Sequence, residues 1–159
     1  MNKLLLTFLF LGIAAAVAGQ EVKKIKITDL EETIRESKGP LIVNFWATFC
    51  IPCIEEIPYF QKLTSKYEKE GVQLLLVSLD MEDDYKKVGP FAKKRKFTAP
   101  IVWLDETNAD YFIPKIDSTW SGAIPATLFL NNSTGYRKFL EESVEEDELE
   151  KEIMAILPR

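Results

Sequence analysis

The sequence contains no histidine and only two cysteines, Cys50 and Cys53. Histidine is the usual general base of nucleophilic sites and a common ligand of zinc and copper, so its absence removes the ordinary partners of cysteine in hydrolases and metal sites. Two cysteines at this spacing also cannot staple a secreted fold, because so small a loop constrains little of the unfolded chain. The pair is therefore predicted to be reactive rather than structural.

The sequence also lacks an excess of positive charge, because it has 25 acidic and 20 basic residues and a net charge of −5. Neither nucleic acid nor an anionic membrane surface is therefore expected as a partner. The basic run Lys93-Lys94-Arg95-Lys96 is interpreted as a solvated helix end, with a docking patch as the alternative. The acidic run Asp80-Met81-Glu82-Asp83-Asp84 lacks the Gly and closing Glu of a Ca²⁺ loop and is interpreted as a solvated helix entrance.

A long hydrophobic run occurs at the N-terminus. Lys3 supplies a positive start, Leu4 to Val17 form the apolar stretch, and Ala16-Val17-Ala18 matches a small-residue cleavage pattern. This pattern predicts a cleaved secretory signal over residues 1–18 and an exported domain over 19–159, in the periplasm if the cell has an outer membrane. The alternative is an uncleaved anchor that faces the same side, although the stretch is short for a bilayer of about 30 Å.

Apolar periodicity predicts an α/β fold with a central mixed β-sheet flanked by helices on both faces. The expected strands are Val22 to Ile27, Leu41 to Phe45, Val72 to Leu79, Ile101 to Leu104, Ala126 to Leu130 and Tyr136 to Leu140, the last two joined by a turn at Asn131 to Gly135. The expected helices run from Asp29 to Ser37, from Cys50 to about Lys69, from about Asp84 to Lys96 with a weakening or break at Gly89-Pro90, around Ala109 to Lys115, and from Ser143 onward.

Two capping boxes are predicted, Asp29 with Glu32 and Ser143 with Glu146, because each pairs a short polar side chain with a glutamate three residues later. Pro58 lies inside the second expected helix, where a proline removes one backbone hydrogen bond and predicts a kink.

The cysteine pair follows the buried strand Leu41 to Phe45 and opens the next helix. A thiol at that position faces unpaired backbone N–H groups and the positive end of the helix dipole, which favours its ionisation. The carboxyl end of a central strand is also where open α/β sheets place their sites. Cys50 and Cys53 are therefore the predicted reactive centre.

Two sequence motifs, one around the cysteines and one before the last two strands, resemble those of a known protein family. Val43-Asn44-Phe45-Trp46-Ala47-Thr48-Phe49-Cys50-Ile51-Pro52-Cys53, with Glu56 and Pro58 behind it, closely resembles the active-site segment of thioredoxin-like proteins, and most of all the exported TlpA/ResA branch of thiol–disulfide oxidoreductases. Gly122-Ala123-Ile124-Pro125-Ala126-Thr127 resembles the loop of that family whose proline is cis and lies across from the CxxC. The resemblance spans the whole mature chain.

The resemblance implies a role for each matching residue. Cys50 would be the exposed attacking thiolate, and Cys53 the resolving thiol that breaks the mixed disulfide. Trp46, Phe49 and Ile51 would form an apolar rim around the sulfur, and the Ile124 backbone would offer strand-like hydrogen bonds to a peptide. The residues expected to contact substrate are Trp46, Phe49, Ile51, Pro52, Ile124 and a cis Pro125.

The chain departs from thioredoxins proper at Asn44, where they carry a buried Asp, and an amide cannot take a proton from Cys53. Glu56 stands where the exported branch places an acid near its cysteines. We therefore expect Glu56 to be the proton acceptor or the group that tunes the thiol pKa, with a solvated helix glutamate as the alternative. Glu55 is the competing candidate and the expected surface residue.

The resemblance implies an enzyme that reduces disulfides in exported proteins, with no cofactor beyond the cysteine pair. Ile51-Pro52 adds no donor or cation to hold a thiolate, which favours a reducing rather than an oxidising protein. Apocytochrome c before haem attachment is the usual client suggested for the family, and a membrane thiol-transferring partner would restore the reduced state.

Three other functions remain open from the sequence. A metal-binding module would use the CxxC as ligands but has no second CxxC or histidine to complete a zinc site. A thiol peroxidase of the same fold would need a threonine and an arginine beside its cysteine, and only Thr48 is near in sequence. A non-catalytic adaptor would be expected to have lost the cysteines, and both are present.

Overall fold

The computed structural model describes residues 22–158, so the predicted signal peptide lies outside the described residues. No helix within this range is long and apolar enough to cross a membrane. The elements, in chain order, are β1 (Lys23–Ile25), α1 (Ile27–Glu36), β2 (Leu41–Trp46), α2 (Ile51–Lys66), β3 (Gln73–Ser78), α3 (Tyr85–Lys94), β4 (Ile101–Leu104), α4 (Ala109–Ile116), β5 (Ala126–Asn131), β6 (Tyr136–Leu140) and α5 (Glu146–Ile156), with 3₁₀ turns at Glu68–Glu70 and Glu82–Asp84.

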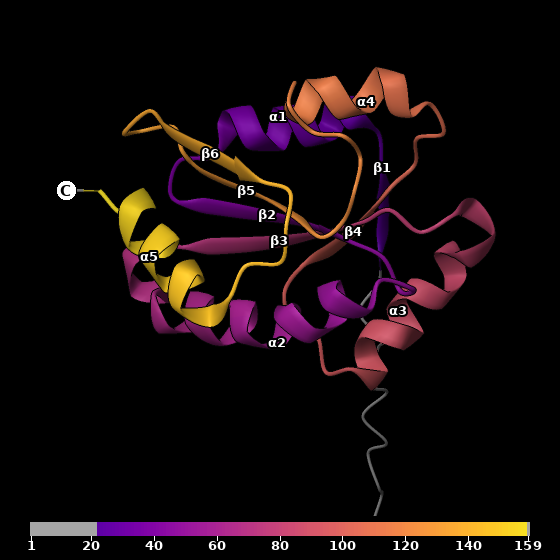
Figure 1. Ribbon diagram of the computed structural model, residues 1–159, viewed down its shortest axis with the longest axis horizontal. Coiled ribbons are helices and arrows are strands. Elements are labelled where there is room, and N and C mark those ends of the chain that lie inside the picture. The colour runs from indigo at the N-terminus through magenta and orange to yellow at the C-terminus, as the bar shows by residue number, and fades with distance from the viewer. Residues whose placement is uncertain (1–21, 159) are drawn as a thin grey trace, which may run out of the picture.

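The six strands form one mixed sheet in the order β1-β4-β3-β2-β5-β6. The pairs β1/β4, β4/β3 and β3/β2 are parallel, whereas β2/β5 and β5/β6 are antiparallel. Helices α1 and α4 cover one face of the sheet, and α2, α3 and α5 cover the other (Figure 1). The predicted mixed sheet with helices on both faces is confirmed.

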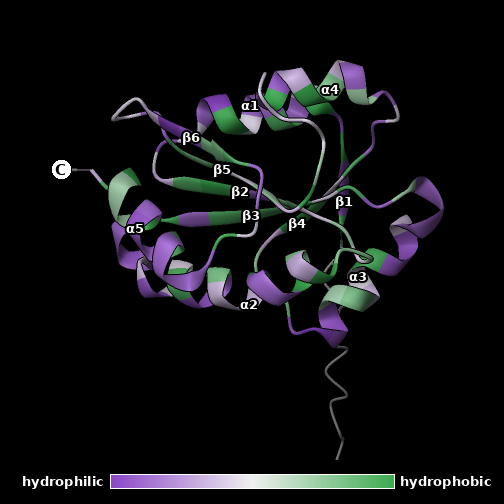
Figure 2. Ribbon diagram, in the orientation of Figure 1, coloured by the Kyte–Doolittle hydropathy of each residue, from purple (hydrophilic) through white to green (hydrophobic). Residues whose placement is uncertain are grey.

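Strand β2 lies in the middle of the sheet and is buried along its whole length. Successive side chains of a strand point to opposite faces, so its residues divide between two cores. Ile42 and Trp46 pack in the core under α2, and Val43 and Phe45 pack in the core under α1 and α4. Asn44 therefore shares the α2 face with Ile42 and Trp46. The apolar colouring of the central strands against the polar outer helices follows this layering (Figure 2).

The start of α1 differs from the prediction. The helix begins at Ile27, whose side chain is buried in the core, two residues before the expected Asp29. The Asp29 carboxylate instead accepts a hydrogen bond from the Lys26 N–H at 2.8 Å. Asp29 thus caps the helix from inside its first turn, and the predicted box with Glu32 is wrong.

The start of α5 is also wrong in the prediction. The backbone of Val144 is held by α2, because its N–H donates to Glu56 Oε2 at 3.1 Å and its carbonyl accepts from the Tyr59 hydroxyl at 2.6 Å. These contacts keep Val144 in the loop, so the helix starts at Glu146 and Ser143 lies outside it.

Two helices continue through an internal proline. Helix α3 runs uninterrupted past Gly89-Pro90, so it does not break there, and the alternative of a weakened helix stays a prediction. Helix α2 continues through Pro58 and ends at Lys66, before the predicted Lys69, and a 3₁₀ turn then leads to Gly71 at a φ of 82°. The predicted kink near Pro58 stays a prediction.

Candidate active site

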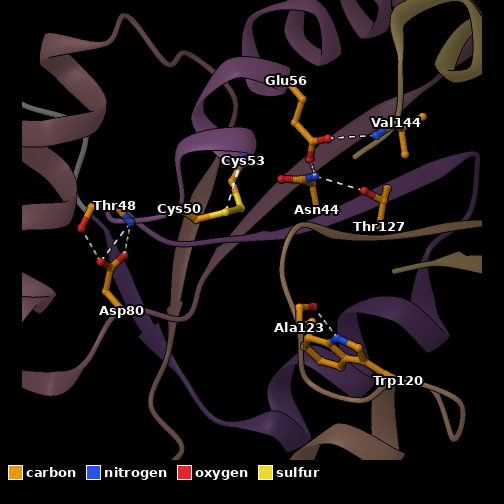
Figure 3. Close-up of a disulfide and its surroundings, with 10 residues drawn as sticks. All are labelled: Asn44, Thr48, Cys50, Cys53, Glu56, Asp80, Trp120, Ala123, Thr127 and Val144. Atoms are coloured by element: carbon orange, nitrogen blue, oxygen red, sulfur yellow. Dashed lines mark hydrogen bonds between the residues drawn. A yellow bond between two sulfur atoms is a disulfide. The ribbon is translucent and has the colours of Figure 1, made fainter. Parts of the chain in front are cut away.

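The two cysteines form a disulfide at the start of α2 (Figure 3). Their Cα atoms are 5.3 Å apart, and Cys50 is the N-cap residue of the helix. The Cys53 N–H donates to the Cys50 sulfur at 3.3 Å, so this sulfur already uses one of the unpaired donors of the first turn. The predicted position of the pair at a helix N-terminus is confirmed.

The two sulfurs differ in access. Cys50 is 7% exposed and Cys53 is fully buried. The expectation that Cys50 is exposed therefore needs correction in degree, because most of this residue is covered in the disulfide state. Cys50 is nevertheless the cysteine of the pair that a second molecule can reach.

The apolar rim consists of fewer residues than predicted. Phe49 and Ile51 are 66% and 67% exposed, and Pro52 is exposed beside them. Trp46 is fully buried and packs against the rings of Phe91 and Phe97, at centroid distances of 6.2 and 5.5 Å. The side chain of Trp46 points into the core from β2, so it cannot contact a substrate at the surface.

The loop before β5 has the predicted cis peptide bond between Ile124 and Pro125. Ile124 is half-buried and packs against the core cluster that contains both cysteines, whereas Pro125 is buried. Ala123 makes two of the contacts that hold the loop. The Trp120 indole donates to the Ala123 carbonyl at 2.8 Å, and the Glu141 carboxylate accepts from the Ala123 N–H at 2.9 Å.

Glu56 lies one turn after Cys53 on α2 and is only 1% exposed. Its Oε1 accepts a hydrogen bond from Asn44 Nδ2 at 2.7 Å, and its Oε2 accepts from the Val144 N–H at 3.1 Å. Burial raises the pKa of this carboxyl to about 7, although the two hydrogen bonds act in the opposite direction. Glu55 is exposed, which agrees with its expected place on the surface.

Asn44 connects the helix to the neighbouring strand. Besides Glu56, its amide nitrogen donates to Thr127 Oγ1 on β5 at 3.0 Å. Within residues 22–158, two buried side-chain polar atoms have no hydrogen-bond partner, Asn44 Oδ1 and Trp46 Nε1. From the sequence, Asn44 was expected only to be unable to take a proton from Cys53, and Thr127 of the second motif was given no role.

Asp80 is a site residue that the sequence interpretation missed. It is 4% exposed, and its carboxylate accepts hydrogen bonds from the Ser78 hydroxyl at 2.7 Å and from the Thr48 N–H at 3.0 Å, as well as from the Thr48 hydroxyl. The solvated acidic run therefore begins after Asp80, with Met81, Glu82 and Asp83 exposed. The available signal was its place directly behind a buried strand that ends beside the cysteine loop.

The features expected of a metal site or a peroxidase site do not surround Cys50. Within the described range, no three His, Cys, Asp or Glu residues gather to hold a metal ion. The Thr48 hydroxyl is bonded to Asp80. The three arginines of residues 22–158 make their contacts elsewhere. Arg35 pairs with acidic residues of α1, Arg95 lies over a ring of α3, and Arg137 donates to a carbonyl of α4.

The chain is similar to known proteins. The model of the AhpC/TSA family matches residues 14–134. A thiol-disulfide oxidoreductase ResA of Bacillus cereus is 32% identical over 147 residues, which cover 88% of this chain and 79% of the relative. ResA of Geobacillus kaustophilus is 26% identical over 156 residues, covering 96% and 85%.

A solved structure shows the same fold. The crystal structure of a thioredoxin-related protein from Neisseria meningitidis serogroup B superposes with a TM-score of 0.65 at 28% identity, and the match covers 77% of this chain and 89% of that one. The expected thioredoxin-like fold, with the Cys50–Cys53 pair at the start of α2, is confirmed.

Proposed function

Because the chain belongs to the AhpC/TSA family and is a thiol–disulfide oxidoreductase of the ResA-like branch, we propose that it reduces disulfides in exported proteins. The observation that carries the proposal is the arrangement along one helix. Cys50 opens α2 on the accessible side, whereas Cys53 and Glu56 lie buried behind it on the first two turns. An accessible sulfur backed by a buried thiol and a buried carboxyl suits attack followed by resolution.

In the first half of the cycle, the Cys50 thiolate attacks one sulfur of a substrate disulfide. A bond forms between Cys50 and that sulfur, and the other substrate sulfur leaves as a thiolate that takes up a proton. The helix N-terminus stabilises the attacking thiolate through its dipole and through the Cys53 N–H. The product of this step is a mixed disulfide at Cys50.

In the second half, Cys53 loses its proton to the Glu56 carboxylate and attacks the Cys50 sulfur. The Cys50–Cys53 bond forms, and the second substrate sulfur leaves. Two electrons have then passed from the enzyme dithiol to the substrate disulfide. A carboxyl whose pKa is about 7 is divided between its two protonation states near neutral pH, so Glu56 suits both accepting and returning this proton.

The substrate would lie across the rim made by Phe49, Ile51 and Pro52, which are all exposed around Cys50. Ile124, next to the cis Pro125, would offer its backbone to an extended peptide. The N-terminal sequence supports export, and the reduced state would be restored by a membrane thiol-transferring protein. Apocytochrome c is the client that the resemblance suggests.

Serine substitution of each cysteine tests these roles. Cys50→Ser should abolish reduction of a disulfide peptide, because no accessible sulfur remains. Cys53→Ser should instead accumulate a covalent adduct at Cys50, seen by mass spectrometry and released by dithiothreitol. Failure of Cys53→Ser to trap an adduct, or turnover by Cys50→Ser, would contradict the assignment.

A further inference from the structure

The Asn44 side chain is fully buried, and only one end of its amide is satisfied. Its nitrogen donates to Glu56 Oε1 at 2.7 Å and to Thr127 Oγ1 at 3.0 Å, which uses both of its N–H groups. Its oxygen accepts no hydrogen bond from any residue in the range 22–158. A buried carbonyl oxygen without a donor carries a desolvation cost that folding does not recover. A donor that reaches this oxygen in another state of the protein would therefore be stabilising.

The oxygen lies on the side of the disulfide. Asn44 points to the α2 face of the sheet, and its partner Glu56 is one turn from Cys53 on that helix. In Figure 3 the Asn44 nitrogen is directed between Glu56 and Thr127, and the oxygen is turned toward the side where Cys53 lies. Cys53 is fully buried, so its sulfur has no water to bond.

The disulfide state lacks a proton that the reduced state has. The Cys53 sulfur is bonded to Cys50 and has no hydrogen to donate. Reduction adds two electrons and two protons, one proton for each sulfur, and so creates a buried S–H group on Cys53. A new donor thus appears on the side toward which the unpartnered oxygen is turned (Figure 3).

We propose that Asn44 is a positioning residue whose Oδ1 accepts a hydrogen bond from the Cys53 thiol in the reduced enzyme. The proposal rests on the role of Cys53 as the resolving thiol. One amide then contacts both groups of the proton transfer, with its oxygen on the thiol and its nitrogen on the Glu56 carboxylate. It fixes the position of the Cys53 sulfur relative to the Glu56 carboxylate, which the same amide holds through its nitrogen. Because the bond exists only after reduction, it favours the dithiol over the disulfide.

Trp46 Nε1 is the competing donor, since it is the other unpartnered buried atom in the described part of the chain. The indole N–H is present in both redox states, whereas the Cys53 thiol is present only in the reduced one. A change at Asn44 that follows reduction therefore separates the two donors.

The first experiment observes the thiol itself. In Cys50→Ser, Cys53 is the only thiol of the chain, so its S–H stretching band can be assigned directly by infrared spectroscopy. The band should lie at the lower frequency of a hydrogen-bonded thiol and should move to higher frequency in Cys50→Ser/Asn44→Leu. Thr127→Val in the same background is the matched control, because it removes the hydrogen bond from Asn44 Nδ2 to Thr127 and keeps Asn44 Oδ1. An unchanged band in the Asn44 variant, or an equal shift in the control, would overturn the proposal.

The second experiment needs no substitution at Asn44. The ¹³C resonance of its side-chain carbonyl should shift between the oxidised and reduced wild-type protein, and an identical resonance in both states would overturn the proposal even if the leucine variant failed to fold.

The redox equilibrium with glutathione gives the functional consequence. In a Glu56→Gln background, Asn44→Leu should change the equilibrium constant roughly fivefold in favour of the disulfide, which corresponds to about 20 mV at 29.6 mV per tenfold change. Trapping at Cys53→Ser is independent of these results, so failure here leaves the reductase proposal standing.

Discussion

Two buried carboxyl groups flank the disulfide, and they are built differently. Asp80 follows β3 in the chain and lies on the side of the cysteine loop, and Glu56 follows Cys53 on α2 (Figure 3). Their exposures are similar, 4% and 1%. Asp80 receives a backbone N–H and two hydroxyl groups, whereas Glu56 receives one amide N–H and one backbone N–H.

The contrast lies in what each carboxyl group contacts and in the effect of burial on Glu56. The donors of Asp80 come from Thr48 and Ser78, so its carboxylate ties the loop that leads into Cys50 to the end of β3. The two donors of Glu56 do not offset its burial, and the pKa of this carboxyl rises to about 7. Similar burial next to one disulfide therefore yields a loop anchor on one side and, on the other, the carboxyl group that we propose as the proton acceptor.

Removing the charge of Glu56 should give the largest effect on stability. The pKa of Glu56 is raised from 4.5 to about 7 in the folded state, so the folded protein holds a proton that the unfolded chain releases. Wild-type stability should then fall as pH rises from 4.5 to 7, by about 3 kcal/mol relative to Glu56→Gln, which stays neutral. Urea unfolding across this pH range measures the difference.

Glu55→Gln is the matched control, since Glu55 is the exposed neighbour on the same helix. It should keep the wild-type pH dependence. Parallel stability curves for Glu56→Gln and the wild type would contradict the raised pKa, and with it the assignment of Glu56 as the proton acceptor.

Asp80→Ala should give the next largest effect. It leaves the Thr48 N–H, the buried Ser78 hydroxyl and the half-buried Thr48 hydroxyl without their acceptor, which should lower the free energy of unfolding by about 2 kcal/mol. Chemical denaturation measures this loss. Asp83→Ala, at an exposed position of the same acidic run, should change stability by no more than about 0.5 kcal/mol. Equal effects of the two substitutions would remove the contrast between Asp80 and its exposed neighbours.

Tyr59→Phe should give the smallest effect of the three. The Tyr59 hydroxyl donates to the carbonyl of Val144, whose N–H in turn bonds Glu56, so its loss should cost about 1 kcal/mol. The exposed Tyr111 is the control, because the structure gives its hydroxyl no hydrogen bond among residues 22–158 and Tyr111→Phe should be close to neutral. A Tyr59 variant as stable as the Tyr111 variant would show that this contact adds nothing.

The sequence predicted the parts of the site that depend on local order. The apolar strand before Cys50, the helix after it and the hairpin closed at Gly135 all carry signals within a few residues, and each was found. Strand β4 and strand β6 have the predicted bounds for the same reason. Local patterns thus sufficed for the order of elements and for the position of the cysteine pair.

The parts that were missed depend on residues far apart in the chain. Glu56 is bonded to Val144, 88 residues later, and that same contact delays the start of α5 beyond the predicted Ser143. Trp46 was placed at the surface by its nearness to Cys50, but the alternation of β2 turns it into the core. Asp80 looked like one more solvated acid until β3 placed it beside Thr48. The contacts of Glu56 with Val144 and of Asp80 with Thr48 join residues 88 and 32 positions apart, so no short window of sequence contains both partners.

The reduction potential of the Cys50–Cys53 pair tests the central claim most directly. A protein of residues 19–159 would be equilibrated with glutathione or dithiothreitol buffers and its redox state determined by thiol alkylation. The account predicts a potential near or below about −270 mV, as expected of a protein that reduces other disulfides. A potential near about −120 mV would reverse the direction of electron flow and make the protein an oxidant that forms disulfides.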